Sequence, residues 1–564
     1  MKRSGLGTGP TGALGRHPVP QRSERNRRDE PASPAPPPAA APYRARPVRR
    51  RAVLAVVCLS ALIVNVDNTI LNVALPTLVR DLGATSSGLQ WIVDSYAMVF
   101  AGLLLVGGSL ADRLGRQRLF LVGRTGFAAG SIGAACSGSV HPLIAFRAVM
   151  GAGAALTIPA SLSIVNDVFR DPAQRARAIG AWAATIGLGT AIGPIAGGLL
   201  LTHFWWGSIF LINVPIVLIA VVCALVLVPD SRNPDAAPAD PVGAILSITG
   251  LGLLLWAIIE APGWGWTSPG VLAVAAASIA ALGGFVAWEA HSSHPMLALG
   301  LFGDRRFSVA AATEVFGLFG LLGGLFVQTQ FLQSDLGFSP LQAGLRILPI
   351  AIMLGVSAPV APILSRLIGT RLTVATGLAV IGCGLSQAAA ASTPAATFAD
   401  TVPGLLLVGL GAGLLLPTAT NSVVGAVPKG DSGVGSASNA VALQVGGALG
   451  VAVIGSALAT RYQNHMSTAL AGQHLPAGVT HTILGSLGGA LAVADRAGGA
   501  RGALLAHAAR TAFINGAGLS MAVGAAVAFS GTVLALAGLP SRRKHPANAA
   551  AGPASADAGP TGRR

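Results

Sequence analysis

The sequence predicts an all-helical integral membrane protein with about fourteen transmembrane helices. Of its 564 residues, 52% are hydrophobic and only 10% are charged, whereas a soluble domain carries about 25% charged residues. Apolar stretches of about 20 residues, the length that crosses roughly 30 Å of hydrocarbon, recur along most of the chain. The 74 glycines among these apolar residues favour close helix–helix packing in lipid.

The predicted spans follow one another with short links, most of which contain charged residues, Gly or Pro. They lie at residues 53–74, 90–110, 119–138, 142–163, 178–200, 209–229, 242–260, 269–288, 307–331, 341–362, 372–392, 402–420, 438–459 and 513–537. Spans one to six form an N-terminal half, and spans nine to fourteen form a C-terminal half. The seventh and eighth spans are predicted to be an inserted linker pair.

Both ends of the chain are predicted to be disordered basic tails. Residues 1–51 are rich in Pro, Ala and Arg and contain twelve of the 37 Lys and Arg residues, and a segment of this composition buries too little surface to fold alone. Residues 540–564 have a similar composition. Because most of the net charge of +16 lies in these tails, we expect no binding of nucleic acid. No secretory signal is expected, since the first apolar stretch is long enough to span.

The short links predict that both termini are cytoplasmic, because cytoplasmic loops carry an excess of Lys and Arg. Only Arg80 lies in a short link on the predicted outer side. Twelve basic residues lie on the predicted inner side, namely Arg113, Arg116, Arg118, Arg170, Arg175, Arg177, Arg232, Arg305, Arg306, Arg366, Arg371 and Lys429.

The domain boundaries follow from this topology. The N-terminal half covers residues 52–230, the linker helices 231–300 and the C-terminal half 301–539. A long extracellular loop is expected at 460–512, with an apolar stretch too short to span the membrane. The two halves echo each other weakly: the link LADRLGRQR at 110–118 is similar to LSRLIGTR at 364–371. Such internal similarity is typical of transporters built from structural repeats.

Four stretches resemble the major facilitator superfamily, and specifically its 14-span drug:proton antiporters. VDNTILNVALP (66–76) is similar to that family's first-span signature, and GGSLADRLGRQR (107–118) to the superfamily's loop motif. RAVMGAGAA, from Arg147, is similar to the basic-residue motif of the fourth span, and GTAIGPIAGG (189–198) to the antiporter motif. The resemblance covers about residues 50–540. It implies a major facilitator fold and the proton-coupled export of drugs or toxic metabolites.

Four charged residues within spans are candidates for proton coupling or substrate binding. A charge at the bilayer centre costs about 2.5–3.5 kcal/mol on insertion scales, so such a residue should face a cavity or a partner. The candidates are Asp67 in the first span, Asp94 in the second, Arg147 in the fourth and Glu314 in the ninth. Buried carboxyl groups can exchange protons, and a lipophilic cation could compete with the proton for the same carboxylate. The resemblance places Arg147, the only basic residue expected deep in the first half, in a proton relay.

Each candidate has a structural alternative. Asp67 could bend its helix or accept a hydrogen bond, and Asp94 could be a polar cap near the interface. Glu314 could pair with Arg305 or Arg306 at the inner end of its span. Arg147 could form a salt bridge with an acid in a neighbouring span.

The link after the second span is a candidate conformational latch. Asp112, Arg113 and Arg116 form a compact charged cluster there, and Gly108 and Gly115 allow a tight turn. Asp112 could pair with an Arg in one conformation and release it in another. Anchoring by positive charge on the inner side explains the two Arg residues but leaves Asp112 unexplained.

The fifth span carries a candidate gate. Gly189, Gly193 and Gly197 fall at i, i+4 and i+8, on one face of a helix where another backbone can approach closely. Pro194 permits a bend, and Gly198 follows directly after Gly197. Close packing alone could explain the glycines, whereas packing in a moving helix suits a gate that closes against leak.

We expect neither an enzyme nor a cofactor. Asp and His residues are too scattered for a catalytic triad or a metal site, and GxxxxGK[ST] is absent. The four cysteines, Cys58, Cys136, Cys223 and Cys383, lie in apolar stretches and are predicted to be buried hydrophobes. The expected partners are a small-molecule substrate, protons and the lipid bilayer, with the protein acting as a monomer.

The sequence therefore predicts a proton-coupled exporter of lipophilic, cationic compounds across the cytoplasmic membrane. Two other functions stay open. The protein could export one endogenous metabolite, such as an antibiotic made by the same cell. It could also be a membrane sensor that does not transport.

Overall fold

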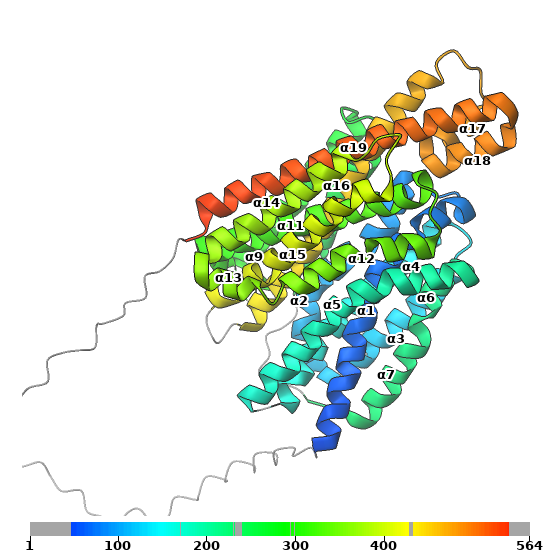
Figure 1. Cartoon of the computed structure of the whole chain (residues 1–564). Coiled ribbons are helices and arrows are strands. Elements are labelled where there is room, and N and C mark those ends of the chain that lie inside the picture. The colour runs from blue at the N-terminus through cyan, green and yellow to red at the C-terminus, as the bar shows by residue number, and fades with distance from the viewer. Residues whose placement is uncertain are drawn as a thin grey trace, which may run out of the picture. The chain divides into compact units, whose positions relative to one another are not determined.

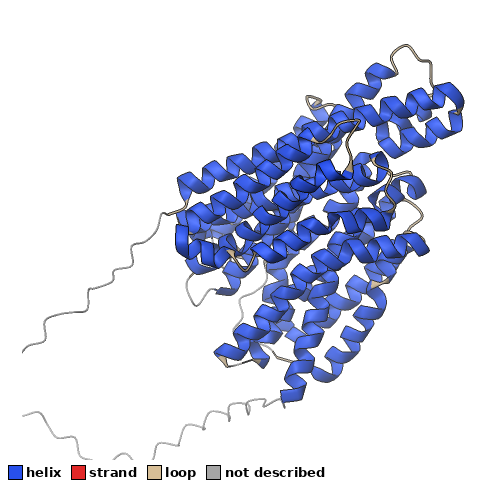
Figure 2. Cartoon of the chain, viewed as in Figure 1, coloured by secondary structure: helices blue, strands red, loops and turns tan. Residues whose placement is uncertain are grey.

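A computed structural model describes residues 47–540, except 170, 229, 232–239, 294, 298 and 428–431. Throughout this described part the regular secondary structure is helical, and Figure 2 shows long helices joined by short loops. The all-helical class predicted from the sequence is confirmed. Most of the two predicted tails lies outside the described residues, apart from residues 47–51, which begin the first helix, and residue 540.

The helices fall into three groups along the chain (Figure 1). The first group is α1 (Pro47–Leu82), α2 (Ser86–Leu114), α3 (Arg116–Ala135), α4 (Val140–Val168), α5 (Pro172–His203), α6 (Ser208–Leu211) and α7 (Asn213–Leu227). The second group is α8 (Pro241–Trp264) and α9 (Pro269–His291), the helices that lie in the predicted linker pair. The last group is α10 (Leu299–Phe302), α11 (Arg305–Gln330), the π-helix η2 (Phe331–Asp335), α12 (Pro340–Ser357), α13 (Ala361–Ile368), α14 (Thr370–Ala390), α15 (Phe398–Ala426), α16 (Ser432–Ala469), α17 (Ala477–Gly485), α18 (Leu487–Ala497) and α19 (Gly499–Gly538).

Within the described part, thirteen helical segments are long and apolar enough to cross a membrane. The predicted span at 119–138 is not among them. It corresponds to α3, a 20-residue helix that contains Arg124 and packs against α4 and α7. Counting α3 gives the expected number of about fourteen.

Local sequence signals set the helix boundaries. Helices α5, α8, α9 and α12 each begin with Pro directly after an Asp or Ser cap. The Asp or Ser side chain accepts a hydrogen bond from one of the first free backbone N–H groups, and Pro suits the first helical position because it has no N–H. The two similar links also have the same backbone geometry. Gly115 separates α2 from α3 with φ 110°, and Gly369 separates α13 from α14 with φ 91°. Both values are in the left-handed region, which glycine adopts readily.

Within each group neighbouring helices pack closely against one another, and the largest buried apolar cluster runs through both the first and the last group. In the first group α1 packs against α5, and α4 against α2 and α3. In the last group α11 packs against α16, and α14 against α15 and α19. The two groups meet along two seams, α2 against α16 and α5 against α12.

The segment expected to be a long loop at 460–512 is helical over most of its length. Helix α16 continues to Ala469, α19 already begins at Gly499, and α17 and α18 form a hairpin between them. The Tyr462 hydroxyl lies 2.9 Å from Ile483 O and 3.2 Å from Ser486 O, which anchors the hairpin to α16. The Ser86 hydroxyl donates to Gly485 O at 3.0 Å, so the hairpin lies beside the α1–α2 loop.

Candidate functional site

An ion pair lies at the centre of the first helix group. Arg147 Nη1 on α4 is 2.5 Å from Asp67 Oδ2 on α1, and both side chains are buried. The Asn213 amide donates to Asp67 Oδ1 at 2.9 Å. Arg147 Nε donates to Ile92 O at 3.1 Å, and its guanidinium lies 4.4 Å from the centre of the Tyr96 ring. Of the readings left open for Arg147, the structure therefore shows the salt bridge with an acid of a neighbouring span.

Glycines let Arg147 reach this position. A Cβ on Gly151 would lie 2.4 Å from Tyr96 O, and a Cβ on Gly107 would lie 2.4 Å from Ala155 O. Such contacts between backbones are possible only where a side chain is missing, so α2 and α4 approach closely at both places. Gly151 of RAVMGAGAA and Gly107 on α2 thus allow the close approach of α2 and α4 on which the position of Arg147 depends.

A second buried base lies nearby, so the expectation that Arg147 is the only basic residue deep in the first half is wrong. Arg124 on α3 is 0% exposed. Its Nη2 donates to Ser60 O at 2.5 Å, and its guanidinium lies 5.7 and 5.8 Å from the centres of the Phe120 and Phe127 rings. The sequence signal was present, because Arg124, the sixth residue of the predicted third span, interrupts an apolar stretch.

Asp94 lies on the α2 face that meets α16. The side chain is 0% exposed, and neither carboxyl oxygen has a hydrogen-bond partner in the described part of the chain. One turn before it, Gln90 Oε1 is 3.2 Å from the Ser456 hydroxyl on α16. Three residues after it, Ala97 lines a small apolar pocket together with Ala448 of α16. Because i−4 and i+3 neighbours share a helix face, Asp94 belongs to the seam between the two groups and is no solvated cap.

Glu314 is the corresponding buried acid of the last helix group. The Thr420 hydroxyl on α15 donates to Glu314 Oε1 at 2.6 Å. With its amide nitrogen turned toward the carboxylate, Asn439 on α16 donates to both oxygens at 2.6 and 2.9 Å. Arg305, an alternative partner considered for Glu314, instead donates to Ala537 O. Neutral donors from two neighbouring helices therefore hold this carboxylate.

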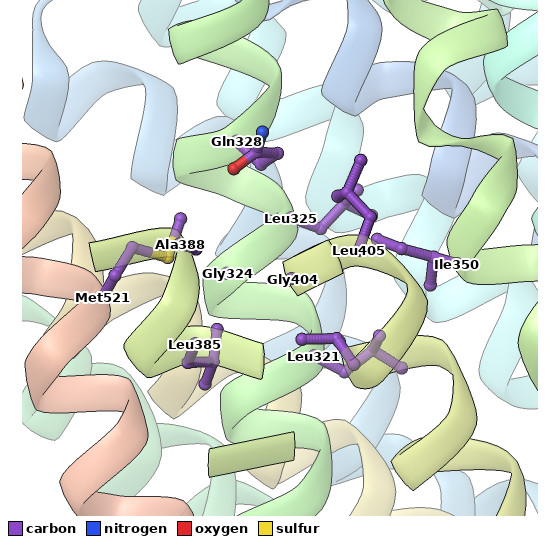
Figure 3. A pocket seen from close by; sticks show the side chains of 11 residues that line it. Leu321, Gly324, Leu325, Gln328, Ile350, Leu385, Ala388, Gly404, Leu405 and Met521 are labelled. Carbon is purple, nitrogen blue, oxygen red and sulfur yellow. The ribbon is translucent and has the colours of Figure 1, made fainter. Parts of the chain in front are cut away.

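A small pocket also lies within the last group (Figure 3). Its wall is apolar apart from Gln328, and its residues come from α11, α12, α14, α15 and α19. Gln328 is 5% exposed, and its Nε2 has no hydrogen-bond partner among the described residues. The pocket is distinct from the Glu314 site, since Glu314 does not line it.

The candidate latch is only partly described. The side chain of Asp112 lies outside the described residues, and Arg113 is exposed. Arg116 forms an ion pair with Asp167 at the end of α4, and its backbone N–H donates to Ser231 O at 3.0 Å. The structure thus ties the α2–α3 turn to the end of α4 and to the chain that follows α7.

The residues of the candidate gate pack against two different helices, α1 and α12. A Cβ on Gly189 would lie 2.6 Å from Asn65 Cβ, and a Cβ on Gly193 would lie 1.9 Å from Thr69 Oγ1. The face formed by Gly189, Gly193 and Gly197 therefore packs against α1 of the same group.

The contact between the two groups involves the face of α5 that is adjacent to the glycine face. A Cβ on Gly198 would lie 2.5 Å from Leu341 Cα of α12, and a Cβ on Gly344 of α12 would lie 2.2 Å from Pro194 O. Gly198 and Pro194 are thus the predicted gate residues that meet the other group. Sequence analysis missed Gly344, as well as Asn213, Thr420 and Asn439, which hold the buried acids.

Comparison with known proteins shows which family has this architecture. The family model described as Major Facilitator Superfamily matches residues 57–451. The chain is 35% identical over 476 residues to the multidrug efflux pump LfrA of Mycolicibacterium smegmatis, covering 83% of this chain and 92% of that protein. It is 34% identical over 492 residues to the tetracenomycin C resistance and export protein of Streptomyces glaucescens, covering 86% and 90%.

A solved structure shares the fold. It is that of a bacterial homologue of the human lysosomal transporter Spinster, in an inward-facing and unoccupied conformation. The match has a TM-score of 0.59 at 18% identity and covers 88% of this chain and 100% of that one.

Proposed function

This chain belongs to the major facilitator superfamily, and on that premise we propose that it exports lipophilic, cationic compounds across the cytoplasmic membrane in exchange for protons. The observation that carries the proposal is the pair of buried carboxyl groups in the first helix group. Asp67 is neutralised by Arg147, whereas Asp94, in the seam between the groups, has no hydrogen-bond donor among the described residues. The relatives named above, a multidrug efflux pump and an antibiotic export protein, support export as the direction of transport.

The position of Asp94 suits a carboxyl group that carries a proton. An ionised carboxylate without a partner is costly at this depth, and a bound proton removes that cost. Because Asp94 lies between α2 and α16, separation of these helices would give the carboxyl group access to water. A cycle that opens the seam on one side and then the other would let Asp94 take up a proton from one compartment and release it to the other.

Asp67 is the proposed site of competition between the proton and the substrate. Its ion pair with Arg147 keeps both charges satisfied in the structure described. A lipophilic cation that approaches Asp67 would take the place of Arg147, and a proton on Asp67 would release Arg147 in the same way. The proton and the cation cannot both neutralise one carboxylate, so their exchange is coupled. Glu314 is the proposed second site, in the other half.

The two halves are proposed to be residues 52–230 and 301–539, joined by the linker pair at 231–300. In the structure their contacts include Gln90–Ser456 and Gly344–Pro194, which lie at the end that carries the α1–α2 loop. With both termini cytoplasmic, this end faces outward and the structure is closed to the outside. The proposed inner latch is the turn that contains Gly108, Asp112, Arg113, Gly115 and Arg116. The transporter is proposed to act as a monomer.

The function is tested by reconstituting the full chain in lipid vesicles with an imposed proton gradient. Addition of a lipophilic aryl cation is expected to release protons, and an imposed gradient is expected to drive accumulation of that cation. A non-transporting sensor would show neither flux, and that result would overturn the proposal.

Asp94→Asn is expected to leave the fold intact and to impair the export of dications more than that of monocations. The substitution removes a carboxyl group whose oxygens have no donor in the described part, so no hydrogen bond is broken. It also removes the second negative charge that a dication would need. Efflux of a mono- and a dicationic dye, compared at matched expression, measures the effect. Unchanged efflux of both dyes contradicts any role of Asp94 in transport, and an equal loss for both dyes contradicts only its role as the second negative charge for a dication.

The orientation is tested by cysteine labelling in a variant that lacks the four native cysteines. Thr480→Cys, in the hairpin region, is expected to react with an impermeant reagent in intact cells. Arg177→Cys, near the start of α5, is expected to react only after the cells are opened. The reverse pattern would show that the termini are outside.

A dedicated exporter of an antibiotic is the second candidate function, favoured by the likeness to the tetracenomycin C export protein. A resistance profile of cells that express the chain separates the two. Protection against several unrelated lipophilic cations supports a multidrug transporter, and protection against one compound supports a dedicated exporter.

A further inference from the structure

The linker helix α8 packs across one of the two seams between the halves. Its apolar face contacts α2, where a Cβ on Gly102 would lie 2.2 Å from Ile248 Cγ1. The same helix contacts α16, where Leu255 and Ile259 form a buried cluster with Ala448 and Ala452. These four side chains are at most 5% exposed. Helix α8 therefore covers the line along which α2 and α16 meet.

Polar contacts at one end of α8 join it to both halves. Trp91 Nε1 on α2 donates to Glu260 Oε1 at 3.0 Å. The Ser456 hydroxyl on α16 donates to Ile258 O at 2.7 Å and also lies 3.2 Å from Gln90 Oε1. Because these contacts involve α2, α8 and α16 together, α8 is held against the seam at the end that we assign to the outside.

The other seam, between α5 and α12, differs. The two helices touch where Gly198 meets Leu341 and Gly344 meets Pro194, and they lie alongside each other in Figure 1. In the described part of the chain, neither linker helix has an extensive contact with α5 or α12. Toward the opposite end both helices expose apolar side chains: Leu188 (54%), Ile192 (40%), Ile352 (58%) and Val356 (60%).

We propose that α8 is a lateral seal, which closes the α2–α16 seam to the bilayer and leaves the α5–α12 seam as the side through which a lipophilic substrate enters from the lipid. The proposal rests on the export function proposed above. A compound dissolved in the bilayer meets apolar side chains of Leu, Ile and Val on α5 and α12. Contact with these side chains costs no free energy relative to contact with the lipid tails. On the opposite side it meets α8, whose apolar contacts fill the seam and shield the region that contains Asp94.

The seal also protects the proton site. Asp94 lies on the same face of α2 as Gln90 and Ala97, and Ala97 lines the small pocket that Leu251 and Leu255 of α8 help to close. A lateral opening of this seam to the bilayer would connect the carboxyl group with headgroup water throughout the cycle, and no longer with only one aqueous compartment at a time. Vesicles that contain the transporter with an intact α8 should therefore keep an imposed proton gradient when no substrate is present.

The test uses the full-length protein in lipid vesicles and a photoreactive, lipid-soluble aryl cation. Labelled residues are identified by mass spectrometry. We expect label on α5 and α12, within the stretch that contains Leu188 and Ile352, to exceed label on α2 and α16 at least tenfold. Equal labelling of the two seams, or preferential labelling of α2 and α16, would overturn the proposal. This ratio does not depend on export, so a failure of the proposed function would leave it unchanged.

Two variants test the seal itself. Leu255→Ala combined with Ile259→Ala removes apolar contacts between α8 and α16, and it should admit label to α2 and α16 and raise the passive proton leak several-fold. Trp91→Phe keeps the packing and removes only the N–H donated to Glu260, so it should raise the leak less. Ile279→Ala on α9, where Ile279 is 73% exposed, is the matched control and should match the wild type. If the Leu255→Ala/Ile259→Ala variant and the Trp91→Phe variant both keep wild-type labelling and leak, α8 is not a seal.

Discussion

Asp67→Asn is expected to abolish proton-coupled efflux of cations. Asparagine keeps the size and polarity of the side chain, but it can neither titrate nor carry a negative charge. A proton that crosses 100 mV supplies about 2.3 kcal/mol, and the transporter can use this free energy only through a group that is protonated from one side and deprotonated to the other. Substrate-induced proton release from vesicles at matched protein levels measures the effect.

A second variant is needed because Asp67→Asn leaves Arg147 buried without its counter-charge. Removing one partner of a buried ion pair costs about 3–5 kcal/mol, so the single variant could lose activity by unfolding. Asp67→Asn combined with Arg147→Gln removes both charges and should restore the level of folded protein in the membrane, but not the coupling. Asp67→Glu, which keeps the charge, should retain part of the activity.

The result that would contradict this assignment is clear. If the folded double variant still releases protons when a cationic substrate is added, the coupling site lies elsewhere. The remaining candidates are then Asp94, the proposed proton carrier, and Glu314. Glu314 is a further buried acid, and in the described part only neutral donors hold it, from Thr420 and Asn439. Glu314→Gln in the same assay would decide whether it carries the coupled proton.

Gly344→Ala is expected to abolish transport while the protein still inserts into the membrane. A Cβ at this position would lie 2.2 Å from Pro194 O, a backbone atom that cannot turn away. The α5–α12 contact would therefore have to open, and the closed state of the outer end would lose stability. Alanine is also a better helix former than glycine, so the substitution should not weaken α12 itself. Efflux and the accessibility of a cysteine introduced at the outer end measure the two effects.

The same helix offers a control. Among the described residues, no atom lies within 4 Å of the point where a Cβ on Gly355 of α12 would lie, so Gly355→Ala should transport as the wild type does. Normal efflux from a well-expressed Gly344→Ala protein would remove the α5–α12 contact from the gate. Gly193→Leu is also expected to abolish transport. The physical reason differs from that for Gly344→Ala, because Gly193 faces Thr69 in the same half. The Gly193→Leu variant should therefore also reduce the amount of folded protein.

The apolar pattern by itself determined the class of the protein and the positions of its spans. A long apolar stretch has one stable arrangement in hydrocarbon, a helix with its backbone hydrogen bonds made internally. The spans could therefore be placed from the apolar pattern alone. The starts of α5 and α12, where Pro172 and Pro340 directly follow a capping Asp or Ser, also agree with a local sequence signal. The same logic marked Asp67, Asp94, Arg147 and Glu314, because a charge inside a span is costly wherever it points.

Only the tertiary structure decided what each of these residues touches. The glycine face of α5 was visible in the sequence, but periodicity does not say that Gly193 meets α1 and that Gly198 meets α12. In the same way, the pairing of Asp67 with Arg147 joins residues 80 positions apart. Such contacts depend on how the helices are arranged in space and on which backbones come close enough to touch. A helical pattern fixes the direction of a side chain relative to its own axis, whereas its partner is fixed by the packing of the whole bundle.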